Sequence, residues 1–300
     1  MKREAIPAVA LGDYRQSLLR GGGFVAVPYQ ESRAWNPTLL TPHYHDFFQM
    51  SLIRGPARLM HDFRETKVRG DTLFFLSPRQ IHAVQSGKET DGTILSFTRE
   101  FFDAGAAGST QFLLELPFYY TADFPPWMSV PARAREATAA LFSEIQGEFN
   151  QARPGAAEII RALLRILLVR ASRWRDNEPA AATPQRAVSL VRDFQLLVER
   201  NYKDWQALTP YARELGVTAN HLNDVVSDAT GRPAGEHIRQ RRLLDAKRLL
   251  LYSELSVAEI GYRLGFKDPS YFGRFFRRYE SRTPAEFRDE IREKYQKDGH

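Results

Sequence analysis

The chain has 300 residues, which is too long for one average domain and long enough for two. Its hydrophobic content of 43% and charged content of 26% exclude a largely disordered or fibrous protein, and the absence of cysteine excludes disulfides, zinc–thiolate sites, iron–sulfur clusters and a cysteine nucleophile. The net charge of +6 mildly favours a polyanionic partner.

The N-terminus carries no recognisable targeting segment. Residues 1–4 run into a mixed stretch without an apolar centre, and no run of about eighteen apolar residues occurs anywhere in the chain. These features predict a cytoplasmic protein with no membrane partner.

Up to about Phe124 the sequence is typical of short strands. Apolar or alternating runs are separated by Gly, Pro, Asn and Asp, as in residues 23–28, 47–53, 71–76 and 93–97. Many short strands without long intervening helices predict an antiparallel barrel or sandwich.

From Pro131 onward the pattern becomes helical, with apolar residues at helical spacing in residues 132–150 and 156–174. A polar stretch bounded by Pro179 and Pro184 then reads as a linker, and everything after it is helical. The fold class predicted is therefore α+β and multidomain, a β-barrel followed by an all-α domain. The boundaries expected are 1–128 for the barrel, 129–174 for a helical segment, 175–185 for the linker and 186–300 for the last domain.

The last segment contains an internal repeat of two capped helix pairs. Thr209-Pro210 opens the first pair, and Thr218 caps its second helix after a glycine turn. About fifty residues later a capping box at 256–259 opens the second pair, and Asp268-Pro269 starts its second helix. A long helix over 234–252 joins the pairs. Short capped helices joined at a glycine predict two helix-turn-helix motifs in tandem.

The second helix of the second pair has one apolar face and one basic face. Its phenylalanines at 272, 275 and 276 predict the buried stripe. The positions that then face outward are Lys267 in the preceding turn, Ser270, Gly273, Arg274, Arg277 and Arg278. Such a helix fits the major groove of DNA, where arginine pairs with guanine and its neighbours hold phosphates.

Two stretches carry a family resemblance. Residues 255–278 read LSVAEIGYRLGFKDPSYFGRFFRR and residues 283–288 read TPAEFR, which resemble the signature of the AraC/XylS transcription regulators. The resemblance implies a seven-helix DNA-binding domain whose two recognition helices enter successive major grooves. It implies base contacts from Lys267, Ser270 and Arg274, with Tyr271 beside them, and backbone contacts from Arg277 and Arg278.

The corresponding helix of the first pair is less basic. Its outward positions are Asn220, Asn223, Asp224 and Ser227, with His221 nearby. Asparagine can read adenine and aspartate can accept from cytosine, but acids lie unfavourably beside phosphates. Asp224 therefore has two open interpretations, base reading or an ion pair with an arginine of the same domain.

The N-terminal region resembles the cupin-type sensor domain of many such regulators. The residues concerned are 42–49, PHYHDFFQ, and 70–82, GDTLFFLSPRQIH. In metal-binding cupins three histidines and a glutamate converge, and here His43, His45 and His82 occupy the histidine positions while Gln49 replaces the glutamate. Three imidazoles can hold a divalent metal, but the alternative of a metal-free pocket is preferred, and no cofactor is expected.

A barrel of this size suits one small-molecule effector. The side chains expected around it are Tyr29, Arg33, Trp35, His43, His45, Gln49 and His82.

Two functions follow. The first is a transcription regulator with no catalytic residues, whose partners are promoter DNA, a small-molecule effector, RNA polymerase and a second copy of the chain that packs through residues 132–150 and 156–174. The alternative is a metal-dependent cupin dioxygenase or isomerase fused to a DNA-binding domain, and metal content with turnover distinguishes the two.

Overall fold

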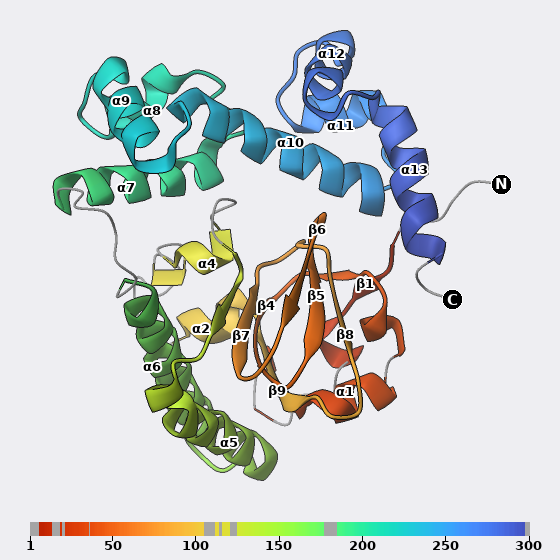
Figure 1. The fold of residues 1–300 in the computed structure, drawn as a ribbon, viewed down its shortest axis with the longest axis vertical. Helices are drawn as coiled ribbons and strands as arrows, with labels where there is room; N and C mark the ends of the chain where they lie inside the picture. Colours follow the sequence, from red (N-terminus) through yellow and green to blue (C-terminus); the bar gives the residue numbers. More distant parts are fainter. Residues whose placement is uncertain are drawn as a thin grey trace.

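The computed structural model describes residues 6–13, 19, 22–35, 37–104, 112–113, 116–120, 125–176 and 185–297. A β-rich region (residues 6–176) is followed by a helical region (residues 185–297), which confirms the predicted fold class (Figure 1). Among the described residues no helix is both long and apolar enough to cross a membrane. Most of the expected linker, residues 177–184, lies outside the described residues.

Three sheets build the β-rich region. A five-stranded sheet has the order β10-β7-β4-β9-β2, a three-stranded sheet has the order β6-β5-β8, and β1 pairs with β3 in parallel. The strands are β1 (Ala8–Val9), β2 (Phe24–Pro28), β3 (Tyr44–His45), β4 (Phe48–Arg54), β5 (Ala57–His61), β6 (Arg64–Val68), β7 (Thr72–Leu76), β8 (His82–Ser86), β9 (Asp91–Phe97) and β10 (Trp127–Ser129).

The pairing of β4 with β9 depends on one glycine. Gly92 has a φ of +144°, and a Cβ added there would lie 1.8 Å from the carbonyl oxygen of Leu52 on β4. Only glycine fits this close approach, so the sheet can run continuously from β7 through β4 to β9.

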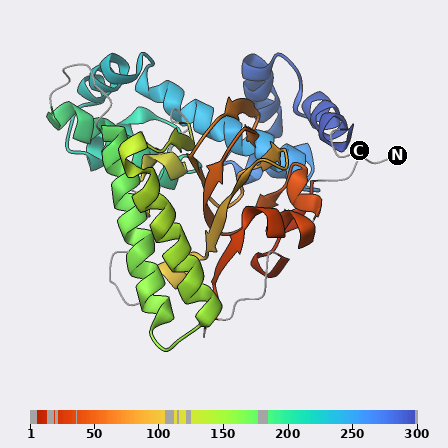
Figure 2. The ribbon, with the colours of Figure 1, turned by 60° about the horizontal axis from the view of Figure 1, so that its bottom comes forward.

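Helices cover the edge of the β-rich region. They are α1 (Tyr29–Trp35), α2 (Arg99–Asp103), α4 (Pro117–Tyr120), α5 (Arg135–Gln151) and α6 (Ala156–Asp176), with 3-10 turns at Leu11–Asp13, Pro37–Leu40 and Ala132–Ala134. α5 and α6 lie side by side (Figure 2) and share the hydrophobic core of the strands through Phe142, Phe149 and Leu164. The helix expected from residue 132 therefore begins as a 3-10 turn.

The helical region contains seven helices within residues 185–297, as the resemblance implied. They are α7 (Gln185–Asn201), α8 (Leu208–Glu214), α9 (Ala219–Thr230), α10 (Ala234–Tyr252), α11 (Val257–Arg263), α12 (Pro269–Glu280) and α13 (Pro284–Lys297). The predicted caps at Thr218, Ser256 and Asp268 are confirmed. The predicted cap at Thr209 is wrong, because α8 begins at Leu208 with Ala207 before it and no side-chain cap.

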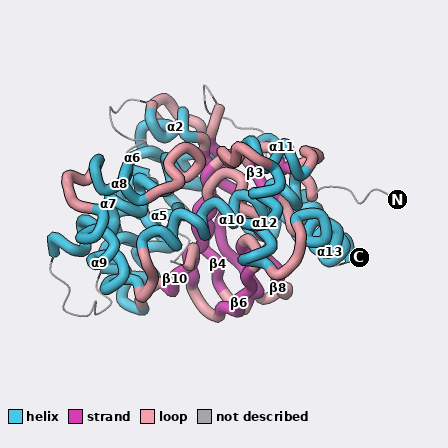
Figure 3. The backbone as a smooth tube through the Cα atoms, turned by 90° about the horizontal axis from the view of Figure 1, so that it is seen from above, coloured by secondary structure: helices cyan, strands magenta, loops and turns pink. Residues whose placement is uncertain are grey.

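α10 connects the two halves of the helical region and also lies against the β-rich region (Figure 3). Met60, Ile81 and Ala83 of the strands form one hydrophobic cluster with Leu251 and Tyr295 of the helices. The β5–β6 turn therefore packs directly on α10 and α13.

Candidate DNA-binding surface and ligand sites

The α11–α12 pair is built by local capping. Ser256 and Glu259 form a reciprocal capping box, and the Asp268 carboxylate accepts from the backbone N–H of Ser270 at 2.8 Å. Gly265 takes a φ of +80° in the turn between the helices. These contacts fix where α12 begins and therefore which of its side chains face outward.

α12 has a buried face and an exposed face, and Phe275, predicted in the buried stripe, is half-buried between them. Phe272 and Phe276 are fully buried. Every residue predicted to contact DNA from this motif is exposed: Lys267, Ser270, Tyr271, Arg274, Arg277 and Arg278. Among the described residues none of the three arginines forms an ion pair, so their charge faces solvent.

On α9 the predicted residues separate into two groups. Asn220, His221 and Asp224 are exposed, and Asp224 forms no ion pair with any described residue. Asn223 is half-buried, and its Oδ1 accepts from the backbone N–H of Ala234 at 3.1 Å. Asn223 thus accepts a hydrogen bond from the first backbone N–H of α10, because Pro233 at the N-cap position provides no side-chain acceptor.

α10 is joined to α7 and to the α11–α12 pair through two consecutive arginines that no sequence motif predicted. Arg241 donates to Glu199 of α7 at 2.7 Å. Arg242 donates to the carbonyl of Leu264 at 2.9 Å, and its guanidinium lies 3.9 Å from the centre of the Phe266 ring. The positions of α7 and of the α11–α12 turn are therefore set by one helix.

Three of the predicted ligand-binding residues meet in the β-rich region. The ring centres of His43 and His82 are 4.2 Å apart, those of His45 and His82 are 4.7 Å apart, and all three side chains are buried. The ring of His45 also stacks on Phe47. Burial lowers the pKa of His43 to about 4 and of His45 to about 3, and it lowers the pKa of His82 well below its usual value.

Hydrogen bonds fix the tautomers of two of these neutral rings. Nδ1 of His43 donates to the Thr41 carbonyl at 2.8 Å, and Nδ1 of His82 donates to the Gln80 carbonyl at 3.0 Å. Their Nε2 atoms are thus acceptors, and both are buried without a hydrogen-bond partner among the described residues. The pair can accept hydrogen bonds from a ligand donor.

The other predicted pocket residues lie in different surroundings. Gln49 is buried and donates to Ser51 at 3.0 Å, while the Tyr29 hydroxyl donates to the Val84 carbonyl at 3.2 Å. The side chains of Arg33 and Trp35 lie outside the described residues.

The histidines do not fit a metal centre as they are arranged. The residues that the structure describes contain no group of three or more histidine, aspartate or glutamate side chains that could hold a metal ion. The three rings pack on one another and on Phe47, and Gln49 brings no carboxylate to them.

A buried ion pair that no sequence motif predicted joins the β-rich region to α10. Asp62, at the β5–β6 turn, accepts from Nε and Nη2 of Arg248 at 2.8 and 2.7 Å. Burial alone raises the pKa of Asp62, but Arg248, His61 and the backbone N–H of Ile81 outweigh it and lower that pKa to about 2. Asp62 is therefore charged at neutral pH, and the two regions are held by a bidentate contact.

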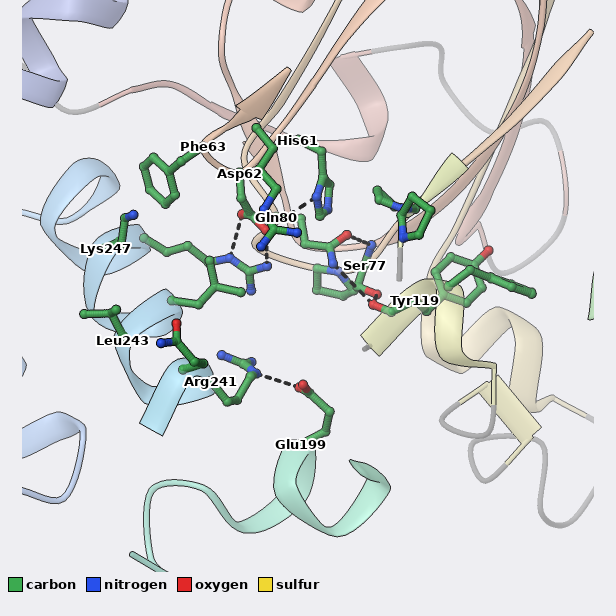
Figure 4. Close-up of a pocket in the computed structure, with 18 of the residues that line it drawn as sticks. His61, Asp62, Phe63, Ser77, Gln80, Tyr119, Glu199, Arg241, Leu243 and Lys247 are labelled. Atoms are coloured by element: carbon green, nitrogen blue, oxygen red, sulfur yellow. Dashed lines mark hydrogen bonds and ion pairs between the residues drawn. The ribbon is translucent and has the colours of Figure 1, made fainter. Parts of the chain in front are cut away.

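Beside this ion pair lies a cavity of about 1080 Å³ (Figure 4). One wall comes from the β-rich region, where Gln80 accepts from the backbone N–H of Ser77 at 2.6 Å and donates to the Tyr119 carbonyl at 3.2 Å. The other wall comes from α7 and α10, where Arg241 and Glu199 face each other. None of the sequence motifs predicted this cavity, because it forms only where the two regions meet.

Comparisons with known proteins agree with both regions. Residues 24–187 match the AraC-like ligand binding domain, and residues 211–290 match a helix-turn-helix domain. The chain is 25% identical over 248 residues to the HTH-type transcriptional activator RhaS of Escherichia coli strain SE11, which covers 82% of this chain and 86% of RhaS.

Two solved structures are also similar. ToxT from Vibrio cholerae O395 is 15% identical, with 89% of this chain and 97% of ToxT covered and a TM-score of 0.42. The C-terminal domain of the response regulator yesN from Fusobacterium nucleatum is 31% identical, with 35% of this chain and 99% of that chain covered and a TM-score of 0.32.

Proposed function

Because the chain belongs to the AraC family of transcription regulators, with a ligand-binding N-terminal domain and a helix-turn-helix DNA-binding domain, we propose that α12 reads base edges in the major groove. The observation that carries this proposal is the exposed basic face of α12 opposite the buried Phe272 and Phe276. Arg274, at the middle of that face, pairs with a guanine, while Arg277 and Arg278 hold phosphates. Lys267, Ser270 and Tyr271 complete the contact surface.

α9 is the second reader, in the adjacent groove. Asn220, His221 and Asp224 are exposed there, and Asp224 accepts from a cytosine amino group. Asn223 contributes from the rim of this surface, because its Oδ1 already accepts from Ala234.

Arg274→Ala and Arg277→Ala test these roles, with binding measured on promoter DNA and on random DNA over a series of salt concentrations. Arg274→Ala should weaken specific binding by about 1–3 kcal/mol and relax the preference at one base pair. Arg277→Ala should weaken binding to all sequences alike and reduce the salt slope by about one. Equal losses on both DNAs for Arg274→Ala would refute base reading.

The effector binds in the β-rich region against His43, His45 and His82, with Gln49, Tyr29, Arg33 and Trp35 as further contacts. The buried Nε2 acceptors of His43 and His82 support this assignment, since a ligand hydroxyl or amine would satisfy them. His43→Ala should abolish the response to the effector while DNA binding survives. A thermal-shift screen of metabolites identifies the effector, and an unchanged response in the variant would count against the pocket.

We further propose that the chain works as a homodimer in the cytoplasm and acts with RNA polymerase. The printed description of RhaS as a transcriptional activator supports activation as the direction of its effect. Residues 1–128 form the sensor, residues 129–174 the dimer helices, residues 175–185 the linker and residues 186–300 the DNA-binding domain. Ile159 and Ile166, on one face of α6, are 41% and 42% exposed and suit a dimer contact. Sedimentation of the Ile159→Glu variant tests this, and a parent chain that is monomeric would overturn it.

No catalytic activity is proposed, because the relatives found are transcriptional activators. Metal analysis of the purified protein tests this point. Stoichiometric iron or manganese together with substrate turnover would favour the cupin enzyme instead.

A further inference from the structure

The two helix pairs of the helical region also contact each other directly, beside α10. The segment between α7 and α8 (residues 202–207) leads into the first pair, α8–α9, and it lies against the turn of the second pair, α11–α12. There the side-chain amide of Gln206 donates to the carbonyl of Gly265 at 2.6 Å. A Cβ added at Gly265 would lie 2.2 Å from the carbonyl oxygen of Lys203. The two backbones therefore meet at a point where only glycine fits.

The α7–α8 segment is itself held in place. The Tyr202 hydroxyl donates to Asp245 of α10 at 2.6 Å, and Nζ of Lys203 lies 3.5 Å from the same carboxylate. At the other end of the segment the Tyr211 hydroxyl of α8 donates to the Trp205 carbonyl at 3.0 Å, and the two rings pack edge to face. The segment is thus fixed to α8 and α10 and can act as a support.

The turn that Gln206 contacts is held from α10 as well. Arg242, which donates to the Leu264 carbonyl, is only 4% exposed and forms no ion pair with a described residue. A buried guanidinium without a carboxylate adds little stability, because its desolvation is not offset by a partner charge. Its contacts with the turn therefore fit a role in placing that turn.

These contacts lie at the N-terminal end of the proposed base-reading helix. Gly265 comes shortly before α12, which begins at Pro269, and the proposed DNA contact Lys267 lies between them. At the C-terminal end of α12 the Tyr279 hydroxyl donates to Glu236 of α10 at 3.2 Å. α12 is therefore held at both of its ends, and the N-terminal contact reaches across to the first helix pair.

Two modules on one rigid frame bind a double site more tightly than either module alone, and looser coupling lowers that gain. A contact beside α10 prevents the second helix pair from rotating about the axis of that helix. We propose that Gln206 and Arg242 are positioning residues, which set the orientation of α12 relative to α9 and thereby the spacing between half-sites that the chain accepts. This inference rests on the proposed reading roles of α9 and α12.

Binding of the full chain to three DNAs tests the proposal, by fluorescence anisotropy at low salt. The first is an operator selected from random DNA with the full chain. The second is that operator with one base pair inserted between its half-sites, and the third keeps only the half-site whose recognition Arg274→Ala relaxes. In the parent chain the inserted base pair should weaken binding by about tenfold, because both helices no longer reach their grooves together.

Gln206→Ala should weaken binding to the operator by about threefold, and Gln206→Ala/Arg242→Met by about tenfold, because the second helix pair is then less firmly oriented. In the double variant the inserted base pair should cost only about threefold. Neither variant should change the affinity for the single half-site by more than about twofold, since no DNA-contacting side chain is altered. Thermal unfolding checks that the variants fold, and Gln206→Ala, at an exposed position, decides the matter if the double variant does not.

Asn201→Ala is the matched control. Its amide donates to the Leu197 carbonyl of its own helix at 3.0 Å, so its loss should change the affinity for each DNA by less than about twofold. An equal loss on the operator and on the half-site, or an undiminished cost of the inserted base pair, would overturn the positioning role. If Arg274→Ala leaves half-site binding unchanged, base reading by α12 fails, and this inference fails with it.

Discussion

Replacing Asp62 with asparagine should lower the free energy of unfolding of the chain by about 3–5 kcal/mol. The Asp62 and Arg248 side chains are only 8% and 7% exposed, and they share two short hydrogen bonds. Removing one partner leaves a buried, uncompensated charge, which typically costs about 3–5 kcal/mol. Asparagine keeps the shape of aspartate and tolerates the φ of +52° at this position, so the change isolates the charge.

Urea unfolding followed by circular dichroism measures the loss. A loss of about 3 kcal/mol lowers the urea midpoint by roughly 1 M if the slope is about 3 kcal/mol/M. Glu65→Gln is the matched control, because the contact of Glu65 with Lys294 crosses the same boundary but its side chains are 44% and 53% exposed. That variant should lose at most about 1 kcal/mol.

The double variant Asp62→Asn/Arg248→Met completes the comparison. It removes both charges of this pair and leaves neither without its partner, so it should lose less stability than Asp62→Asn alone. The reasoning would be refuted if the loss in the double variant equalled the sum of the losses in Asp62→Asn and Arg248→Met alone. It would also be refuted if Glu65→Gln lost as much stability as Asp62→Asn.

The same ion pair makes stability depend on pH. The pKa of Asp62 is lowered from 3.8 to about 2, so its contribution is fully present above pH 4 and is lost as the pH falls through about 2. The difference corresponds to roughly 2.5 kcal/mol at pH 7. Between pH 4 and pH 2 the parent chain should therefore lose more stability than Asp62→Asn, by an amount on the order of this contribution. Urea unfolding of both proteins at each pH measures the difference.

Two other predictions concern the separate regions. Burial lowers the pKa of His43 from 6.5 to about 4 and that of His45 to about 3. The stability that these neutral rings contribute is therefore fully present above pH 6.5 and should fall as the pH drops toward 4. In thermal unfolding at each pH, His45→Gln should flatten this dependence, and a curve parallel to that of the parent chain would contradict the prediction. Gly265→Ala should lower the free energy of unfolding by more than about 2 kcal/mol, because the added Cβ would lie 2.2 Å from the Lys203 carbonyl oxygen. Gly216→Ala, at a φ of +68° with no atom near the added Cβ, should lower it by only about 1 kcal/mol. Equal losses would contradict the steric argument.

Features that depend on neighbouring residues could be predicted from the sequence. The caps at Thr218, Ser256 and Asp268 use partners two or three residues away, so their pattern is visible in the chain itself. The buried stripe of α12 follows from helical periodicity alone. This is why most of α12 can be predicted from the sequence, although Gly273, expected to face outward, and Phe275, expected in the buried stripe, are both half-buried.

Features that depend on distant partners could not be predicted. Asp62 and Arg248 are 186 positions apart, and nothing near either residue distinguishes it from an exposed charge. Asn223 lies on the outward side of α9, yet its carbonyl is used by α10 eleven residues later. An asparagine that reads bases and one that caps a helix look alike until the next helix is placed.

The construction of α10 also limits which promoters the chain can recognise. Its 19 residues span about 28 Å, and it is held to α7 through Arg241 and to the turn before α12 through Arg242. One extra base pair between the half-sites turns the second groove by about 35° about the DNA axis, and a full extra turn moves it by about 34 Å. A single helix of fixed length such as α10 can accommodate neither change. If α9 and α12 read the two half-sites as proposed, we expect the operator to keep a single spacer length, whatever its base sequence.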